Sequence, residues 1–162
     1  MDKYKFKQVD IRLKLSQAKP LYSTEQITTA QKAVEVMAEY LVQMDREYCC
    51  VVNMDAANHP INFNVVSIGD TNHTPVPMQN VFKSAILSNA ASILILHNHT
   101  GRSLTPSTFD VDMTLKMVKA GRLMNIPVLD HVIVAGSTYD RCFSFKEQEP
   151  TAVVGAGRGR RL

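Results

Sequence analysis

The segment SILILHNHTGRSLTPSTFDVD, residues 92–112, carries the strongest structural signal in this chain of 162 residues. Its apolar start, Ser92 to Leu96, is typical of a buried strand, and this strand would deliver two histidines at its carboxyl end. Because side chains alternate along an extended segment, His97 and His99 should share one side while Asn98 points to the other. Two imidazoles on one side can share a cation such as zinc. The segment therefore predicts a strand that ends at a metal site.

A third metal ligand could come from Asp110, which follows His99 by eleven residues and would reach the histidines if the loop folds back. Three protein ligands and one open position are typical of a catalytic zinc site, whereas structural sites are closed by four. Ser107 and Asp110 also fit a helix start, with Ser107 as N-cap and Asp110 favouring the positive helix end. We prefer the N-cap interpretation for Ser107 alone and leave both open for Asp110. They are compatible, because a capped helix is a rigid mount for a ligand.

The rest of the chain shows further strands and helices on both sides of this segment. Period-two and helical spacing predict strands at Val9–Leu15, Tyr48–Met54, Ile61–Ile68, Ser92–Leu96, Val128–Ala135 and Tyr139–Phe145, and helices from Thr28 onward, over Gln79–Asn89 and over Ser107–Met124. Thr28 with Gln31 resembles a capping box. Strands paired in a hairpin and then joined through helices imply an α/β fold, a mixed sheet flanked by helices.

Composition bounds the class of protein. A chain of 162 residues is expected to form one main domain with a core that needs no metal or disulfide. No apolar run reaches membrane-spanning length and the amino terminus is charged, so we expect a cytoplasmic protein without a membrane partner. Three cysteines without C-x-x-C spacing argue against a disulfide frame or a cysteine zinc site. Cys49 and Cys50 are expected to fill core volume on the two faces of their strand.

Basic charge is concentrated at the ends of the chain. The net charge is +3, and the tail after residue 154 holds three arginines, so the remainder is neutral. Residues 1–21 form a basic arm that includes the strand predicted at 9–15, and residues 148–162 are expected to be a flexible Gly/Arg-rich tail. Flexible basic ends can bind nucleic acid weakly and without sequence preference. A solubilising role is the preferred interpretation, because no aromatic residues interleave the tail as a stacking platform.

The motif H-x-H, seven residues, S-x-x-D resembles the JAMM metallopeptidase signature of JAB/MPN domains, and the surrounding sequence is similar to the bacterial RadC-like JAB domain. The resemblance runs from about Tyr22 to Glu147 and implies a domain over 22–147 with JAB/MPN, cytidine-deaminase-like architecture. It is carried by Ile61–Gly69, Val81–His99, Thr105–Gly136 and Phe143–Glu147.

This resemblance implies a zinc-dependent metallopeptidase or isopeptidase that hydrolyses an amide in a peptide or protein. His97, His99 and Asp110 would hold Zn²⁺, and Ser107 would stabilise the oxyanion. Glu47 occupies the position of the upstream glutamate and would act as general base and then acid. The local sequence alone favours a solvated glutamate in a charged turn for Glu47.

Three more histidines remain to be placed. His131, in the sequence LDHV, is preferred as a histidine at the core edge that bonds to the backbone, with a supporting position beside the metal as the alternative. His59 and His73 fall in turns and are expected to be exposed.

Two departures from the family pattern border the expected site. The loop after the histidines has Thr100 where the family has proline and reads Arg102-Ser103-Leu104 further on, and Met78-Gln79-Asn80 replaces Pro-Arg-Glu. We therefore expect the substrate groove, or its rigidity, to differ from that of the family. Two other function classes stay open: a non-catalytic MPN-type interaction module, and an accessory protein of DNA repair or mobile elements.

Overall fold

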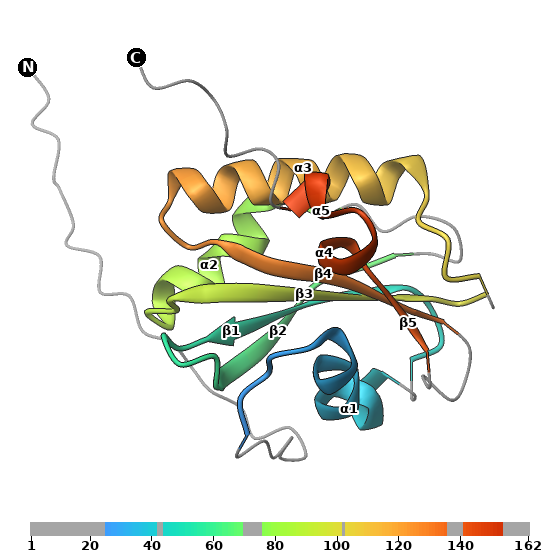
Figure 1. Ribbon diagram of the computed structural model, residues 1–162, viewed down its shortest axis with the longest axis horizontal. Coiled ribbons are helices and arrows are strands. Elements are labelled where there is room, and N and C mark those ends of the chain that lie inside the picture. Colours follow the sequence, from blue (N-terminus) through green and yellow to red (C-terminus); the bar gives the residue numbers. More distant parts are fainter. Residues whose placement is uncertain (1–24, 42–43, 70–75, 102, 136–140, 154–162) are drawn as a thin grey trace, which may run out of the picture.

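The computed structural model describes residues 25–41, 44–69, 76–101, 103–135 and 141–153 (Figure 1). The strand predicted at 9–15, the basic arm, His73 and the arginine-rich end of the chain lie outside these residues. Within the described ranges, no helix is both long enough and apolar enough to cross a membrane.

The described strands form one five-stranded sheet in the order β2-β1-β3-β4-β5. Its strands are β1 (Tyr48–Met54), β2 (Pro60–Ile68), β3 (Ser92–His99), β4 (Val128–Ala135) and β5 (Cys142–Ser144). Strands β3 and β4 pair in parallel, while β1 pairs antiparallel with β2 and β3, and β5 antiparallel with β4. The β1–β2 hairpin turns through Asn58, which has the positive φ of 61° that asparagine tolerates. The parallel β3–β4 pair needs a crossover, which the intervening helix provides.

Helices cover both faces of this sheet (Figure 1). Helix α1 (Ala30–Leu41) lies on one face, and α2 (Met78–Leu87) and α3 (Thr108–Leu123) lie on the other with the short helices α4 (Phe145–Gln148) and α5 (Pro150–Val153). The prediction of an α/β fold with a mixed sheet flanked by helices is confirmed.

Alternation along the central strands divides the core into two layers. Cys49 packs in the layer under α2 and α3, and Cys50 in the layer over α1, as predicted. Both thiols are buried and free, like the half-buried Cys142. On β3 the same alternation sends Ile95 toward α3 and Leu96 toward α1.

Several element boundaries differ from the prediction; α2, for example, spans Met78–Leu87 where Gln79–Asn89 was predicted, and β2 begins at Pro60. Strand β3 continues through His99, so both histidines lie within the strand. The first helix is capped one residue later than predicted, because the hydroxyl of Thr29 accepts the Lys32 N–H at 3.1 Å. Phe145 begins helix α4 instead of ending a strand, because the side chain of Ser144 accepts the Glu147 N–H and caps that helix. The fully buried phenyl ring fills the core in the helix as it would have done in a strand.

The beginning of the predicted flexible tail packs against the body of the protein. Residues Pro150–Val153 form helix α5, and Val153 is buried in the α3 layer of the core. Arg122 donates from Nη2 to the Val153 carbonyl at 2.8 Å. The packed body therefore extends to Val153, beyond the boundary predicted at residue 147.

Candidate metal and catalytic site

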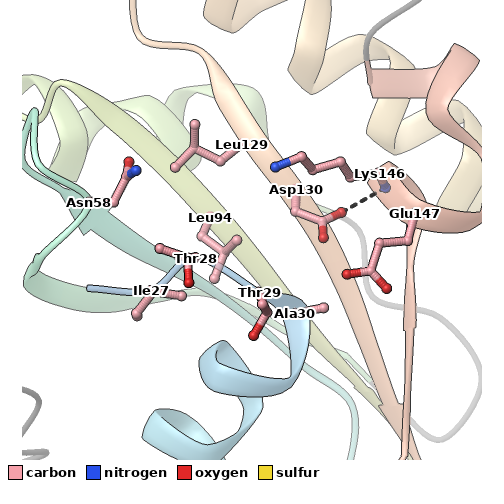
Figure 2. Close-up of a pocket in the computed structure, with 10 residues that line it drawn as sticks. All are labelled: Ile27, Thr28, Thr29, Ala30, Asn58, Leu94, Leu129, Asp130, Lys146 and Glu147. Carbon is pink, nitrogen blue, oxygen red and sulfur yellow. Dashed lines mark hydrogen bonds between the residues drawn. The ribbon is translucent and has the colours of Figure 1, made fainter. Parts of the chain in front are cut away.

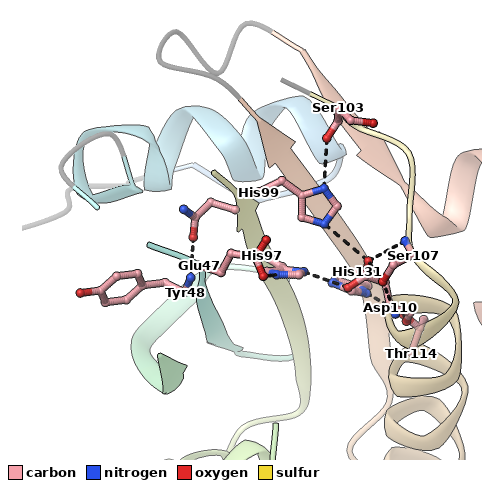
Figure 3. A network of polar contacts seen from close by, with 10 residues as sticks. Glu47, Tyr48, His97, His99, Ser103, Ser107, Asp110, Thr114 and His131 are labelled. Carbon is pink, nitrogen blue, oxygen red and sulfur yellow. Dashed lines mark hydrogen bonds and ion pairs between the residues drawn. The ribbon is translucent and has the colours of Figure 1, made fainter. Parts of the chain in front are cut away.

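The two histidines lie together at the carboxyl end of β3, on the face that α3 covers (Figure 3). His97 is paired across the sheet with Cys49 on β1 and is only 3% exposed. The ring centroids of His97 and His99 are 4.9 Å apart. The alternation predicted for H-x-H therefore places both imidazoles on one side, as expected.

Helix α3 delivers Asp110 to these rings. Ser107 is its N-cap: the Ser107 hydroxyl accepts the Asp110 N–H at 3.2 Å, and the Asp110 carboxylate accepts the Ser107 N–H at 2.7 Å. This reciprocal capping confirms the N-cap interpretation of Ser107. The carboxylate also faces both histidines, with Oδ1 3.2 Å from His97 Nδ1 and Oδ2 3.5 Å from His99 Nε2. The capped helix is thus the rigid mount that the sequence suggested.

Glu47 turns inward, so the expectation of a solvated glutamate is wrong. Its side chain is 11% exposed, and Oε2 lies 3.6 Å from His97 Nε2. The two neighbouring charged residues, Asp45 and Arg46, pair with each other at the surface at 2.7 Å. The charged turn therefore exists, and Glu47 points away from it toward the histidines.

The electrostatics of the cluster suit a cation. Burial would lower the pKa of His97, but the carboxylates of Asp110 and Glu47 outweigh it and hold this pKa above its ordinary value. Burial would raise the pKa of Asp110, yet its contacts with His97, His99 and Ser107 hold it far below its ordinary range. Asp110 is therefore an anion, and the space between the two carboxylates favours positive charge.

The donor set fits a divalent metal ion. Among the described residues, Glu47, His97 and His99 bring one candidate ligand atom each to within 4.8 Å of one another. Asp110 lies outside this group, although its two oxygens face the two histidines. Neither ring nitrogen of His97 has a partner with hydrogen-bond geometry in the described part of the chain. Nδ1 of His99 lies 3.0 Å from the Ser103 carbonyl, which leaves Nε2 as the nitrogen for a ligand bond.

His131 lies beside this cluster and is fully buried. Its Nδ1 is 2.6 Å from the hydroxyl of Thr114, and that hydroxyl is 2.6 Å from the Asp110 carbonyl. Because the hydroxyl has one proton and the carbonyl only accepts, Thr114 donates to the carbonyl and His131 donates to Thr114. Burial lowers the pKa of His131 to about 3, and the neighbouring His97 is the second cause of this shift. The ring is therefore neutral near pH 7.

The preferred interpretation of His131 was therefore wrong in its bonding partner, which is a side chain and not the backbone. Its ring stacks on Phe145 with centroids 4.9 Å apart and is 6.1 Å from the ring of His97. Sequence reasoning missed Thr114, which lies four residues after Asp110 and therefore on the same helix face. That spacing was the signal that could have indicated it. His59, predicted to be exposed, has a side chain that is 43% exposed and faces Asp55.

A separate pocket of about 170 Å³ lies on the α1 face of the sheet (Figure 2). It is lined by Ile27, Thr28, Thr29, Ala30, Asn58, Leu94, Leu129, Asp130, Lys146 and Glu147. The buried carboxylate of Asp130 accepts the backbone N–H groups of His131 at 2.8 Å and Lys146 at 2.9 Å and the Ser144 hydroxyl at 2.6 Å. The bonds to Ser144 and Lys146 tie β4 to β5 and α4, which is a structural role.

Fold and site together define an α/β domain with a candidate metal centre at one edge of its sheet. The chain belongs to the RadC-like JAB domain family, whose match covers residues 27–150 and so includes every residue of the candidate site. The resemblance to the RadC-like JAB domain is thereby confirmed.

Curated relatives agree with this family. A UPF0758 protein of Desulfitobacterium hafniense (strain DSM 10664 / DCB-2) is 34% identical over 122 residues, which are 75% of this chain and 52% of that protein. A UPF0758 protein of Caldanaerobacter subterraneus subsp. tengcongensis is 35% identical over 122 residues, 75% of this chain and 51% of that protein. One of Chloroflexus aggregans is 37% identical over 108 residues, 65% of this chain and 47% of that protein. The chain spans about half the length of these relatives.

Proposed function

We propose that this domain is a zinc-dependent amide hydrolase that cleaves a peptide or isopeptide bond in a protein substrate. One observation carries the proposal: two histidines from β3, the glutamate that precedes β1 and an aspartate from α3 converge at the carboxyl end of β3. Burying two carboxylates against two imidazoles is costly, and packing of the core alone does not require it. A metal-dependent reaction would require these groups to lie together.

His97, His99 and Asp110 are the proposed zinc ligands, as one carboxylate and two imidazoles make a common catalytic set. When bound there, zinc would supply a Lewis acid that lowers the pKa of water from 15.7 to about 7. The ring of His99 is already oriented by the Ser103 carbonyl, and the backbone of Asp110 by the Thr114–His131 chain. These supporting contacts hold the donors before any metal arrives.

Glu47 is the proposed proton shuttle. Its Oε2 lies beside His97 Nε2, close to the proposed zinc ligands. A proton that Glu47 takes from water would therefore stay near the reacting bond and could pass to the leaving amine. Glu47 is also within the group of candidate donors, so a role as a fourth ligand is the rival interpretation. The two roles predict different zinc affinities for Glu47→Gln. A proton shuttle near the ligands predicts binding that is weaker by only about tenfold, whereas a fourth ligand predicts that most of the affinity is lost.

Ser107 is the proposed oxyanion donor, and its present bonding constrains how it would act. Its hydroxyl donates to Asp110 Oδ2 at 2.6 Å. The side chain is exposed, so rotation about Cβ–Oγ would turn the proton toward a substrate carbonyl while the oxygen still accepts the Asp110 N–H. Donation to an oxyanion is typically worth about 2.7–4 kcal/mol in the transition state.

A peptide substrate is supported by a pocket of about 340 Å³ between α2 and α3. Phe109, which precedes Asp110 and is 40% exposed, lines this pocket. Its wall includes Met78, one of the residues that depart from the family pattern. We assign this pocket to an apolar side chain of the substrate.

Substrate trapping tests the proposal. The Glu47→Gln variant, loaded with zinc, is expected to capture proteins that the wild type then cleaves, with the rate of the variant lower by roughly 10²–10⁴. His99→Ala, which should lack zinc, is the matched control and should capture none of them. Captured proteins that the zinc-loaded wild type leaves intact would contradict a hydrolase and favour a non-catalytic interaction module.

A further inference from the structure

Asn98, between the two histidines, points away from the metal side and is only 2% exposed. Its side chain reaches the start of β1, fifty residues earlier in the chain. The Oδ1 atom accepts the Tyr48 N–H at 2.7 Å, and Nδ2 donates to the Arg46 carbonyl at 2.9 Å. The amide therefore bonds to the residues on both sides of Glu47.

These bonds extend the contact between β1 and β3 beyond their last pair of residues. Among the described residues that pair is Cys49 with His97, and the Asn98 side chain bonds to Arg46 and Tyr48, which lie just before it on the β1 side. An amide side chain has a carbonyl acceptor and N–H donors, so it can bond to a strand backbone as a peptide group would. On the opposite side, the Gly69 N–H donates to the Glu47 carbonyl at 2.8 Å. The backbone around Glu47 is thus fixed from both neighbouring strands.

We propose that Asn98 is a positioning residue, which holds the segment Arg46–Tyr48 so that the carboxylate of Glu47 faces His97. This inference rests on the proposed function, because Asn98 acts through Glu47. The requirement is specific to the amide: leucine has a similar size but neither donor nor acceptor, and serine is too short to bridge both backbone groups. A purely structural role would make Asn98 important for the fold and unimportant for what Glu47 does.

A double-mutant cycle on zinc binding separates these roles. Zinc dissociation constants are measured by competition with a chromophoric chelator for the wild type, Asn98→Leu, Glu47→Gln and the double variant. Asn53→Leu is the matched control, because Asn53 is also buried and donates to Asn62 Oδ1 at 2.6 Å at the far end of β1. That control should lower stability and leave zinc affinity unchanged.

We expect Asn98→Leu and Glu47→Gln each to weaken zinc binding by about tenfold, the lower end of the range for residues that support metal ligands. The double variant should bind zinc as Glu47→Gln does, because the position that Asn98 gives to residue 47 no longer matters once the carboxylate charge of Glu47 is removed. In metal-free protein, Asn98→Leu should also speed exchange of the Tyr48 amide hydrogen by about tenfold, as the loss of one hydrogen bond implies.

A double variant weakened by the product of the single effects, about a hundredfold, would overturn the inference, because Asn98 would then act on His97 and His99 directly. Unchanged exchange of the Tyr48 amide would overturn it as well. If Asn98→Leu does not fold, Asn98→Ser enters the same cycle. A non-additive cycle in a protein that cleaves nothing would contradict the hydrolase proposal but not the role of Asn98. An additive cycle in an active enzyme would contradict the role of Asn98 but not the hydrolase proposal.

Discussion

Replacing Asp110 by asparagine tests which carboxylate holds the metal. Asp110 is buried, and its low pKa keeps it ionised throughout the usual assay range. Asparagine removes the charge but keeps an oxygen that can accept the Ser107 N–H, so the start of α3 should stay capped. The substitution therefore removes the proposed ligand with little change to the fold.

The size of the effect follows from ligand linkage. At a free zinc concentration one hundred times its dissociation constant, zinc stabilises the folded state by about 2.7 kcal/mol. For a protein of this length each kcal/mol raises Tm by about 2–4 °C, so the wild type should gain roughly 5–11 °C. Glu47→Gln, with tenfold weaker binding, should keep about 1.4 kcal/mol, or roughly 3–6 °C. Asp110→Asn should keep almost none of this gain.

Thermal unfolding with zinc at a buffered free concentration, and again with chelator, measures all three proteins side by side. His99→Ala serves as the control for a lost ligand and should also show no zinc-dependent gain. The reasoning is refuted if Asp110→Asn keeps the full gain in Tm while Glu47→Gln loses it. That result would make Glu47 a ligand and would leave the hydrolase proposal without its proton shuttle.

Further predictions concern stability, measured by urea or thermal unfolding. Ser107→Ala should cost about 1 kcal/mol and Ser107→Asn much less, because asparagine also caps helices; equal losses would contradict the cap. Gly121→Ala should lower the free energy of unfolding by about 1–3 kcal/mol, because its new Cβ would lie 2.5 Å from the Ile126 carbonyl oxygen. An unchanged stability would show that the backbone at the end of α3 shifts without cost. Deleting residues 154–162 should barely change the stability. Val153→Ala should lower it by about 1.5 kcal/mol, because that side chain is buried. A larger loss from the deletion than from Val153→Ala would place the packed end of the chain beyond Val153.

Local pattern was enough for the elements that carry the site. The bounds predicted for β1 and β4 match the structure, because each strand is a largely apolar run that contains valines and is flanked by turn residues. The side shared by His97 and His99 followed from strand alternation, and the helix start at Ser107 followed from capping chemistry. Each of these features depends on residues close together in the sequence.

The position of Glu47 could not be read in the same way. Three adjacent charged residues at the end of a turn favour solvent exposure, and for Asp45 and Arg46 that is what the structure has. Whether the third residue turns inward depends on two contacts from distant segments, the amide of Asn98 and the N–H of Gly69. Both contacts require the register of β1 against β2 and β3, which only the folded sheet fixes. Sequence therefore predicts the histidines from local rules, while the carboxylate that would make the site catalytic is placed by strand pairing.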